Sequence, residues 1–375
     1  MRRLPVVWFA ACMAAVLLTS CALTEKNVDP ERKLQVGFYI DDGSRGGNVL
    51  NWARLLYYSP QLEVTLLQGQ DVRDGKLKGL DLLVVPGGSS QKQYLSMREE
   101  GAEAIRKFVA AGGAYYGICA GFHCTLNRDE RIKLLPFTYV YKGGGERAML
   151  AIDLSEKGAK LLDIRPGRWR VQYSHGPICR PGDQPGEGWG EVLATYQSTV
   201  GPLGRNGGDF YGSPSIIHGQ FGKGKVIATG FHPESWPSTY PIALGCIYAV
   251  TGVKPVPEFP VKSPRPVRVG YMVPSPTGEP AIRQMLEIDR EPDMDVRFCS
   301  LAEDADHLDA VVFPAPLPGA YKKFSPEMLA AAKRFMDRGG RVYAKDPAYE
   351  RLPKHKNLKH LEKDASFVKA IRADF

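Results

Sequence analysis

Short apolar segments alternate with amphipathic ones through the first third of the chain. Apolar runs of four to eight residues are typical of buried strands, and apolar side chains repeating every three or four residues are typical of helices packed on a sheet. The expected strands are residues 34–40, 62–67 and 80–85, and the expected helices are residues 48–58 and 101–111. This alternation predicts an α/β fold with a doubly wound, flavodoxin-like parallel sheet.

A glycine-rich turn follows the next apolar run. Residues 114–118 form a buried strand by this pattern, and the spacing Gly117-x-Cys119-x-Gly121 then turns the chain sharply into a helix. The first N–H groups of that helix would favour the thiolate form of Cys119. A strand end that simply buries a cysteine is the ordinary structural alternative, and this motif alone does not decide between the two.

A second segment supplies the partners that a nucleophilic cysteine needs. An apolar strand within residues 222–231 leads to His232 and Glu234, whose spacing of two places both side chains on one face of an extended chain. An imidazole can take the proton of a thiol, and a carboxylate can fix the tautomer of that imidazole. The pattern predicts a triad of Cys119, His232 and Glu234.

These residues resemble a known family. Residues 108–121, together with His232-Pro233-Glu234, are similar to the class I glutamine amidotransferase superfamily, and most of all to the domain at the N-terminus of some biotin-protein ligases. The resemblance covers roughly residues 34–252, and we place the domain at residues 34–253. It implies that Cys119 is the nucleophile, His232 the base and Glu234 the orienting acid.

The resemblance also implies an oxyanion hole and a substrate pocket. The backbone N–H groups of Gly88 and Ala120 would bind the oxyanion. Glutamine-using members carry Gln at the position of His123, so free glutamine is not implied as the substrate. The weaker candidates for substrate contact are Gly87, His123, Tyr173 and His175. For the two histidines a structural or solvated role is the alternative, and for Gly87 a plain tight turn.

Four further segments or residues have an expected structural role. We expect residues 139–146 and 173–177 to be loops that wall the pocket, and His218 to pack within a strand at residues 215–220. The sequence Asp41-Asp42-Gly43 ends the first strand at the edge where α/β sheets bind ligands, although Asp-Gly is also ordinary turn chemistry. We favour the turn.

The N-terminus has the pattern of an exported lipoprotein. Arg2 and Arg3 precede an apolar stretch at residues 4–18, and Leu18-Thr19-Ser20-Cys21 resembles a lipobox. We expect residues 1–21 to be a signal peptide, Cys21 to be lipidated, and residues 22–33 to be a tether, with the protein anchored in the bacterial outer membrane and facing the periplasm. A cleaved signal peptide with an incidental cysteine is the alternative.

Composition adds limits on partners and cofactors. The 375 residues are 43% hydrophobic, which suffices for two domains, and the formal charge of +8 shows no Lys/Arg block, so nucleic acid is not expected as a partner. We also expect no metal and no cofactor. Besides Cys12, Cys21 and Cys119 the chain has four cysteines, whose disulfide pairing the sequence leaves open: Cys124, Cys179, Cys246 and Cys299.

The last third of the chain looks like a repeat of the first. A proline-rich linker at residues 254–266 precedes residues 267–375, in which residues 267–272 echo the first strand and Gly339-Gly340 echoes the pair before the elbow strand. Asp346 then stands where Cys119 stands, so we expect a smaller, degenerate and non-catalytic α/β domain. Convergence of generic β-α-β patterns is the alternative.

Two functions remain open at this stage. The first is a cell-envelope cysteine hydrolase that acts on an amide or related acyl bond of a small molecule or peptide. The second is a tethered binding or scaffold lipoprotein that keeps the pocket without turnover. No protein partner is indicated by the sequence.

Overall fold

The computed structural model describes residues 32–142, 147–182, 188–198, 211–273, 277–299, 307–314, 324–362 and 364–375. The expected signal peptide, Cys21, nearly all of the tether and residues 143–146 lie outside the described residues. Residues Leu34–Phe375 form one compact unit. No helix in the described part of the chain is both long and apolar enough to cross a membrane.

Five neighbouring strands of the larger sheet are parallel, as the sequence predicted. Its parallel strands stand in the order β2-β1-β3-β4-β11. Their bounds are β1 Leu34–Tyr39, β2 Leu62–Leu67, β3 Leu82–Val85, β4 Ala114–Ile118 and β11 Gly224–Thr229. The helices associated with them are α1 Gly46–Tyr57, α2 Gly69–Arg73, α3 Ser90–Ala110, α4 Ala120–Thr125 and α6 Tyr240–Thr251.

Alternate side chains of these strands enter two cores, one on each face. In β4, Tyr116 packs edge-to-face on Trp52 of α1 with ring centroids 5.3 Å apart, whereas Tyr115 lies in the other core with Ile105 and Val109 of α3. Successive side chains of a strand point to opposite faces, so an apolar run without polar gaps needs cover on both sides. This double burial confirms the doubly wound α/β fold.

The sheet continues beyond β11 in a way that the sequence pattern did not indicate. Antiparallel strands extend it in the order β10-β9-β6-β7, so the sheet is mixed rather than wholly parallel. Their bounds are β10 Pro214–Phe221, β9 Gly188–Tyr196, β6 Ala148–Leu154 and β7 Gly167–Tyr173, with α5 Glu156–Leu162 between β6 and β7. A separate antiparallel pair consists of β5 Phe137–Lys142 and β8 Pro177–Pro181.

The expectation of a loop at residues 139–146 was therefore wrong for residues 139–142, which lie in β5. Glycines and prolines punctuate this region, and its strands are partly exposed, so neither a continuous apolar run nor a clean alternation marks them. The expectation for residues 173–177 holds only for residues 174–176, which form the turn between β7 and β8.

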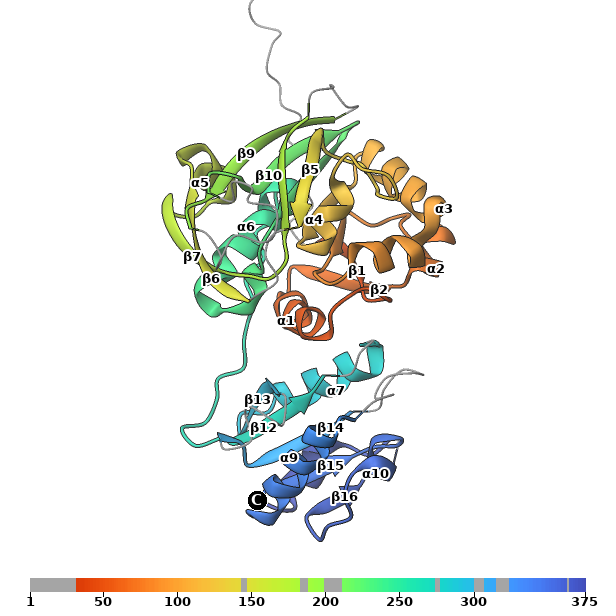
Figure 1. Cartoon of the computed structure of the whole chain (residues 1–375), viewed down its shortest axis with the longest axis vertical. Helices are drawn as coiled ribbons and strands as arrows, with labels where there is room; N and C mark the ends of the chain where they lie inside the picture. Colours follow the sequence, from red (N-terminus) through yellow and green to blue (C-terminus); the bar gives the residue numbers. More distant parts are fainter. Residues whose placement is uncertain are drawn as a thin grey trace, which may run out of the picture. The chain divides into compact units, whose positions relative to one another are not determined.

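A second, smaller sheet repeats the strand order of the first. It runs β13-β12-β14-β15-β16 with all strands parallel, matching β2-β1-β3-β4-β11 position by position (Figure 1). The strands are β12 Val267–Met272, β13 Met294–Cys299, β14 Ala310–Phe313, β15 Arg341–Ala344 and β16 Leu358–His360, and the helices are α7 Glu279–Asp289, α9 Pro326–Asp337, α10 Ala348–Arg351 and α11 Phe367–Arg372. The prediction of a second, smaller α/β domain is confirmed.

Some local contacts of the first domain also occur at the equivalent positions of the second domain. Asp81 accepts a hydrogen bond from the backbone N–H of Gln35 at 2.9 Å, and Asp309 accepts the equivalent bond from Arg268 at 2.8 Å. A β-carbon on Gly113 would lie 2.4 Å from the ring of Phe108, and one on Gly340 would lie 2.4 Å from the ring of Phe335. Shared detail of this kind favours a true repeat over convergence.

The segment between the domains has no helix or strand from residue 253 to residue 266, but it is not free of contacts. The N–H of Glu258 donates to the carbonyl of Tyr58 at 2.7 Å. Nearby, the fully buried carboxylate of Asp289 accepts hydrogen bonds from Arg54 at 2.9 and 3.0 Å and from the Tyr58 hydroxyl at 2.9 Å. A buried carboxylate with two such partners ties α7 to α1.

We predict that Asp289→Asn lowers the free energy of unfolding by about 3 kcal/mol, because it leaves the guanidinium of Arg54 without its buried counter-ion. Urea denaturation measures this change. Asp337→Asn, which removes an exposed ion pair with Lys333, is the control and should change the stability little. Equal stability loss in the two variants would contradict the prediction.

Candidate active site

Cys119 lies at a strained elbow between β4 and α4. Its backbone has φ 51° and ψ −96°, a conformation that residues with side chains rarely adopt. Two glycines make room for the turn: a β-carbon on Gly117 would lie 2.5 Å from the carbonyl oxygen of Gly121, and one on Gly121 would lie 2.1 Å from that of Val85. The N–H of Cys119 donates to Thr229 of β11 at 2.8 Å, which fixes the elbow between two strands.

His232 and Glu234 follow β11 and are paired. The Nδ1 of His232 lies 2.9 Å from Oε1 of Glu234, and both side chains are buried. The pairing expected from the spacing is present, although the backbone differs from the expectation: Pro233–Ser235 form a 3-10 turn rather than an extended segment. The N–H of His232 donates to Gln172 of β7 at 2.8 Å and so anchors the turn to the sheet.

Opposing influences set the charge of His232. Burial lowers its pKa, but the charges of Glu234 and Cys119 and the hydrogen bond to Glu234 outweigh burial and raise the pKa to about 10. The surroundings of His232 therefore favour the protonated ring. A protonated imidazole next to a cysteine favours the thiolate, the nucleophilic form of sulfur. The Cys119 Sγ also lies 3.3 Å from the carbonyl oxygen of Ser174, to which the neutral thiol donates.

The two proposed oxyanion donors occupy equivalent positions on neighbouring strands. Val85 of β3 pairs with Gly117 of β4 in parallel register, and Gly88 and Ala120 each come three residues later. Gly88 has φ 154°, and a β-carbon there would lie 1.8 Å from the carbonyl oxygen of Gly43. Ala120 is the first residue of α4, so its N–H has no acceptor within the helix. Their oxyanion role stays a prediction.

Gly87 lies against the ring of His232. A β-carbon at this position would lie 2.4 Å from Cε1 of His232 and 2.6 Å from Nδ2 of Asn48. A side chain here would displace the ring, so glycine is needed for close approach as well as for the turn. Sequence reasoning missed Asn48, whose only signal was its place in the first turn of the helix that follows β1.

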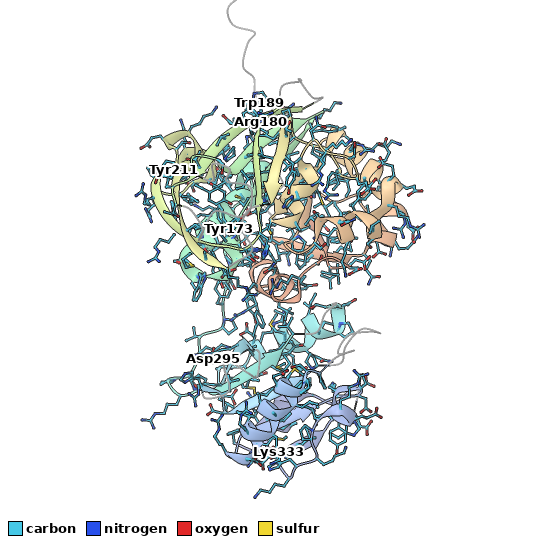
Figure 2. The ribbon with its side chains drawn as sticks, in the orientation of Figure 1. Tyr173, Arg180, Trp189, Tyr211, Asp295 and Lys333 are labelled. Atoms are coloured by element: carbon cyan, nitrogen blue, oxygen red, sulfur yellow. The ribbon has the colours of Figure 1, made fainter. Side chains whose placement is uncertain are left out.

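Of the predicted substrate contacts, Tyr173 lies in the interior. Its side chain, labelled in Figure 2, is fully buried. Its hydroxyl donates to the carbonyl of Gly176 at 2.9 Å, and its ring packs edge-to-face on Tyr196. Tyr173 therefore holds the 174–176 turn in place, and its contact with substrate stays a prediction. A β-carbon on Gly176 would lie 1.8 Å from the carbonyl oxygen of Gly230, so the turn is pressed against the segment that leads to His232.

The predicted histidines divide between the site and the core. His175 is half-buried in the 174–176 turn with φ 58°, and its Nδ1 lies 3.2 Å from the hydroxyl of Ser174. His123 is buried on α4, with its ring 5.3 Å from that of Tyr139. His218 packs within β10 as expected, and its ring lies 6.0 Å from Trp189.

Asp41 and Asp42 have the turn role that we favoured. Asp41 accepts from the N–H of Gly69 at 2.8 Å and from the Ser96 hydroxyl, and Asp42 accepts from the N–H of Gly43 at 2.8 Å. Within the described part of the chain, neither carboxylate forms a hydrogen bond or ion pair with Cys119, His232 or Glu234. They stabilise the end of β1 and the loop that backs Gly88.

The other described cysteines differ from Cys119 in their surroundings. Cys119, Cys124, Cys179 and Cys246 are all unpaired and buried. Burial raises the pKa of Cys124 and of Cys246 to about 12 and raises that of Cys179 still further. Within the described residues, no three His, Cys, Asp or Glu side chains gather as metal ligands would. The pairing of Cys299 stays open.

Comparison with known proteins gives one family match. Residues 73–128 match the family described as "Biotin-protein ligase, N terminal". The Schizosaccharomyces pombe protein "Biotin--protein ligase" is 28% identical over 177 residues, which is 41% of this chain and 25% of that protein. The chain thus matches about a quarter of the length of that relative.

Two bacterial relatives match over most of their own length. "Pyridoxal 5'-phosphate synthase subunit PdxT" of Arthrobacter sp. (strain FB24) is 30% identical over 179 residues, 43% of this chain and 73% of that protein. "Phosphoribosylformylglycinamidine synthase subunit PurQ" of Rhodopseudomonas palustris (strain ATCC BAA-98 / CGA009) is 29% identical over 185 residues, 42% of this chain and 72% of that protein. Among solved structures, "Structure of PurLQS from Thermotoga maritima" aligns with a TM-score of 0.43 and 18% identity, over 57% of this chain and 98% of that one.

We predict that iodoacetamide alkylates Cys119 far faster than Cys124 or Cys246 at about pH 6, because protonated His232 favours the thiolate only at Cys119. Peptide mass spectrometry of partly labelled protein measures the three rates. His232→Ala should slow labelling of Cys119 by roughly tenfold or more and leave the other two unchanged. The prediction fails if Cys119 and Cys246 are labelled at equal rates.

Proposed function

Because the chain belongs to the class I glutamine amidotransferase-like superfamily, we propose that it is a cysteine hydrolase that cleaves an amide or a related acyl bond. The observation that carries this proposal is the buried His232–Glu234 pair, in which the charge of Cys119 is one of the causes that raise the pKa of His232. All three side chain types that acyl transfer requires are present, and the charge of the ring suits a thiolate nucleophile. The bacterial relatives support the coarser description, a hydrolase of glutamine amidotransferase type.

The proposed reaction has two halves. The Cys119 thiolate attacks the carbonyl carbon and forms a C–S bond, while the N–H groups of Gly88 and Ala120 would hold the oxyanion. As this intermediate collapses, the C–N bond breaks and His232 gives its proton to the leaving nitrogen, which departs as ammonia or an amine. Water then attacks the thioester and gives its proton to His232, the C–S bond breaks, and the acid leaves with Cys119 restored as thiolate.

A binding protein without turnover is the competing function. It is favoured by one observation, the buried His123 at the position where glutamine-using relatives carry Gln. The two functions differ in one measurable respect, because only a hydrolase releases ammonia or an amine in proportion to time.

We predict that the chain without residues 1–21 hydrolyses at least one member of a panel of primary amides, short peptides and free glutamine, followed as ammonia or amine release. Cys119→Ala should lower kcat/KM by roughly 10³-fold or more, because it removes the nucleophile. Glu234→Gln should act in the same direction with a smaller loss, since it removes the charge that supports the imidazolium. A panel that is bound but never cleaved would establish the competing binding function.

We also propose that the protein is a lipoprotein of the bacterial cell envelope, facing the periplasm. This rests on the sequence alone, namely the two N-terminal arginines, the apolar stretch and the small residues before Cys21. Two or more acyl chains would give stable anchoring where one would not.

We predict that Cys21→Ser releases the protein from the membrane fraction of its bacterial host, because the thiol that carries the lipid is lost. Immunoblots of membrane and soluble fractions measure the distribution. Cys12→Ser, which alters the apolar stretch but not the acceptor, is the matched control and should remain in the membrane fraction. Unchanged fractionation of Cys21→Ser would overturn the anchor.

A further inference from the structure

Two arginines lie next to the proposed catalytic centre, and neither has a role in the triad. Arg45 precedes α1, and its backbone N–H donates to the carbonyl of Gly87 at 2.9 Å. Gly87 in turn is the residue on which the ring of His232 packs. Arg45 is therefore fixed to the loop that covers one side of the site.

Asn48 shows that this part of α1 faces the same loop. Its Nδ2 would lie 2.6 Å from a β-carbon on Gly87, and it follows Arg45 by three residues. Arg45 is the N-cap of α1 and has an extended backbone. A side chain amide, which can donate and accept hydrogen bonds, thus lies close to the same loop that Arg45 contacts through its backbone.

Arg147 approaches from the opposite strands. It directly precedes β6, where Ala148 pairs with Tyr173 of β7 in antiparallel register. The register places Arg147 across from Ser174, whose carbonyl oxygen accepts the Cys119 thiol at 3.3 Å. Arg45 therefore lies next to Gly87, and Arg147 lies next to Ser174. Ser174 is the residue whose carbonyl oxygen the Cys119 thiol contacts.

The charges of these groups affect one another. Burial lowers the pKa of Arg45, the like charge of Arg147 lowers it further, and Cys119 raises it. Among the described residues, neither guanidinium forms an ion pair with a carboxylate, and both residues remain partly open to solvent. Two neighbouring guanidinium groups repel each other, an anion bound between them reduces that repulsion, and guanidinium groups match the geometry of a carboxylate.

We propose that Arg45 and Arg147 bind a carboxylate on the acyl side of the substrate, so that the substrates of this site are amides or related acyl compounds that carry a negative charge close to the scissile carbonyl. This inference rests on the proposed function, since it assigns the substrate class of the same site. It differs from that function in naming residues outside the triad, which would set specificity rather than perform the chemistry. Arg45 and Arg147 would also raise the rate of encounter with such substrates through their charge.

Two alkylating agents test this without knowledge of the natural substrate. Iodoacetamide is neutral, whereas iodoacetate carries a carboxylate one bond from the carbon that sulfur attacks. We expect the ratio of iodoacetate to iodoacetamide rates at Cys119 to exceed the ratio for a small free thiol. Arg45→Gln and Arg147→Gln should each lower that ratio severalfold and together by roughly tenfold, because iodoacetate loses more rate than iodoacetamide does. Added salt should lower the wild-type ratio and have little effect in the double variant.

The matched control is Arg168→Gln, which removes an arginine that already pairs with Asp153. It should leave the ratio at the wild-type value. If the double variant loses iodoacetamide and iodoacetate rates equally, the arginines support the thiolate and do not bind a substrate anion, and the proposal is overturned. A normal ratio in wild-type protein would overturn it as well. Failure of the proposed function is a separate result, because it would appear as slow labelling by both reagents in wild-type protein.

Discussion

The site depends on a strained backbone at Cys119 that its neighbours hold in place. A residue with a side chain at φ 51° and ψ −96° persists only where packing determines it, at a cost of order 1–3 kcal/mol. Here Gly117 packs closely on Gly121, and Gly121 packs closely on Val85, so the surrounding backbone holds Cys119 in this conformation. The hydrogen bond from Cys119 to Thr229 closes the elbow from the β11 side. The stability of the central sheet offsets the strain, and the result is a thiol exposed to its partners at the end of a strand.

The same sheet explains why distant segments of the chain meet. Parallel strands end at one edge, and β3, β4 and β11 are neighbours, so the residues just beyond them come together: Gly87 and Gly88, Cys119, and His232. The 174–176 turn closes the group because Gly176 is pressed on Gly230. Each contact is made by backbone or by a buried side chain, so the geometry is largely fixed before a substrate arrives. Preorganisation of this kind is what electrostatic stabilisation of a developing oxyanion requires.

Sequence reasoning succeeded where a single physical signal dominated. Continuous apolar runs gave β1, β2 and β4 nearly to the residue, and the glycine spacing around Cys119 gave the elbow. It failed for β5 to β9, whose half-exposed strands lack a clear period. It could not show the surroundings of Tyr173, because an aromatic residue near a loop looks the same in the sequence whether it lines a pocket or supports a turn from behind. Arg45, Asn48 and Arg147 could not be found in advance, since their position depends on strand register and on the contacts of Gly87.

The second domain shows which features of the first domain belong to the fold and which belong to the proposed site. It keeps the strand order, the Asp309 contact with the strand backbone and the packing of Gly340 on Phe335, so a sheet of this kind forms without a cysteine at the position of Cys119. Aligning the two Gly-Gly pairs puts Ala344, Asp346 and Ala348 where Gly117, Cys119 and Gly121 stand. β-Carbons at the two glycine positions would collide with backbone oxygens in the first domain. A chain with alanine at both positions therefore cannot form the same elbow. Replacing the two glycines would by itself remove the turn on which Cys119 lies, even if the cysteine were kept.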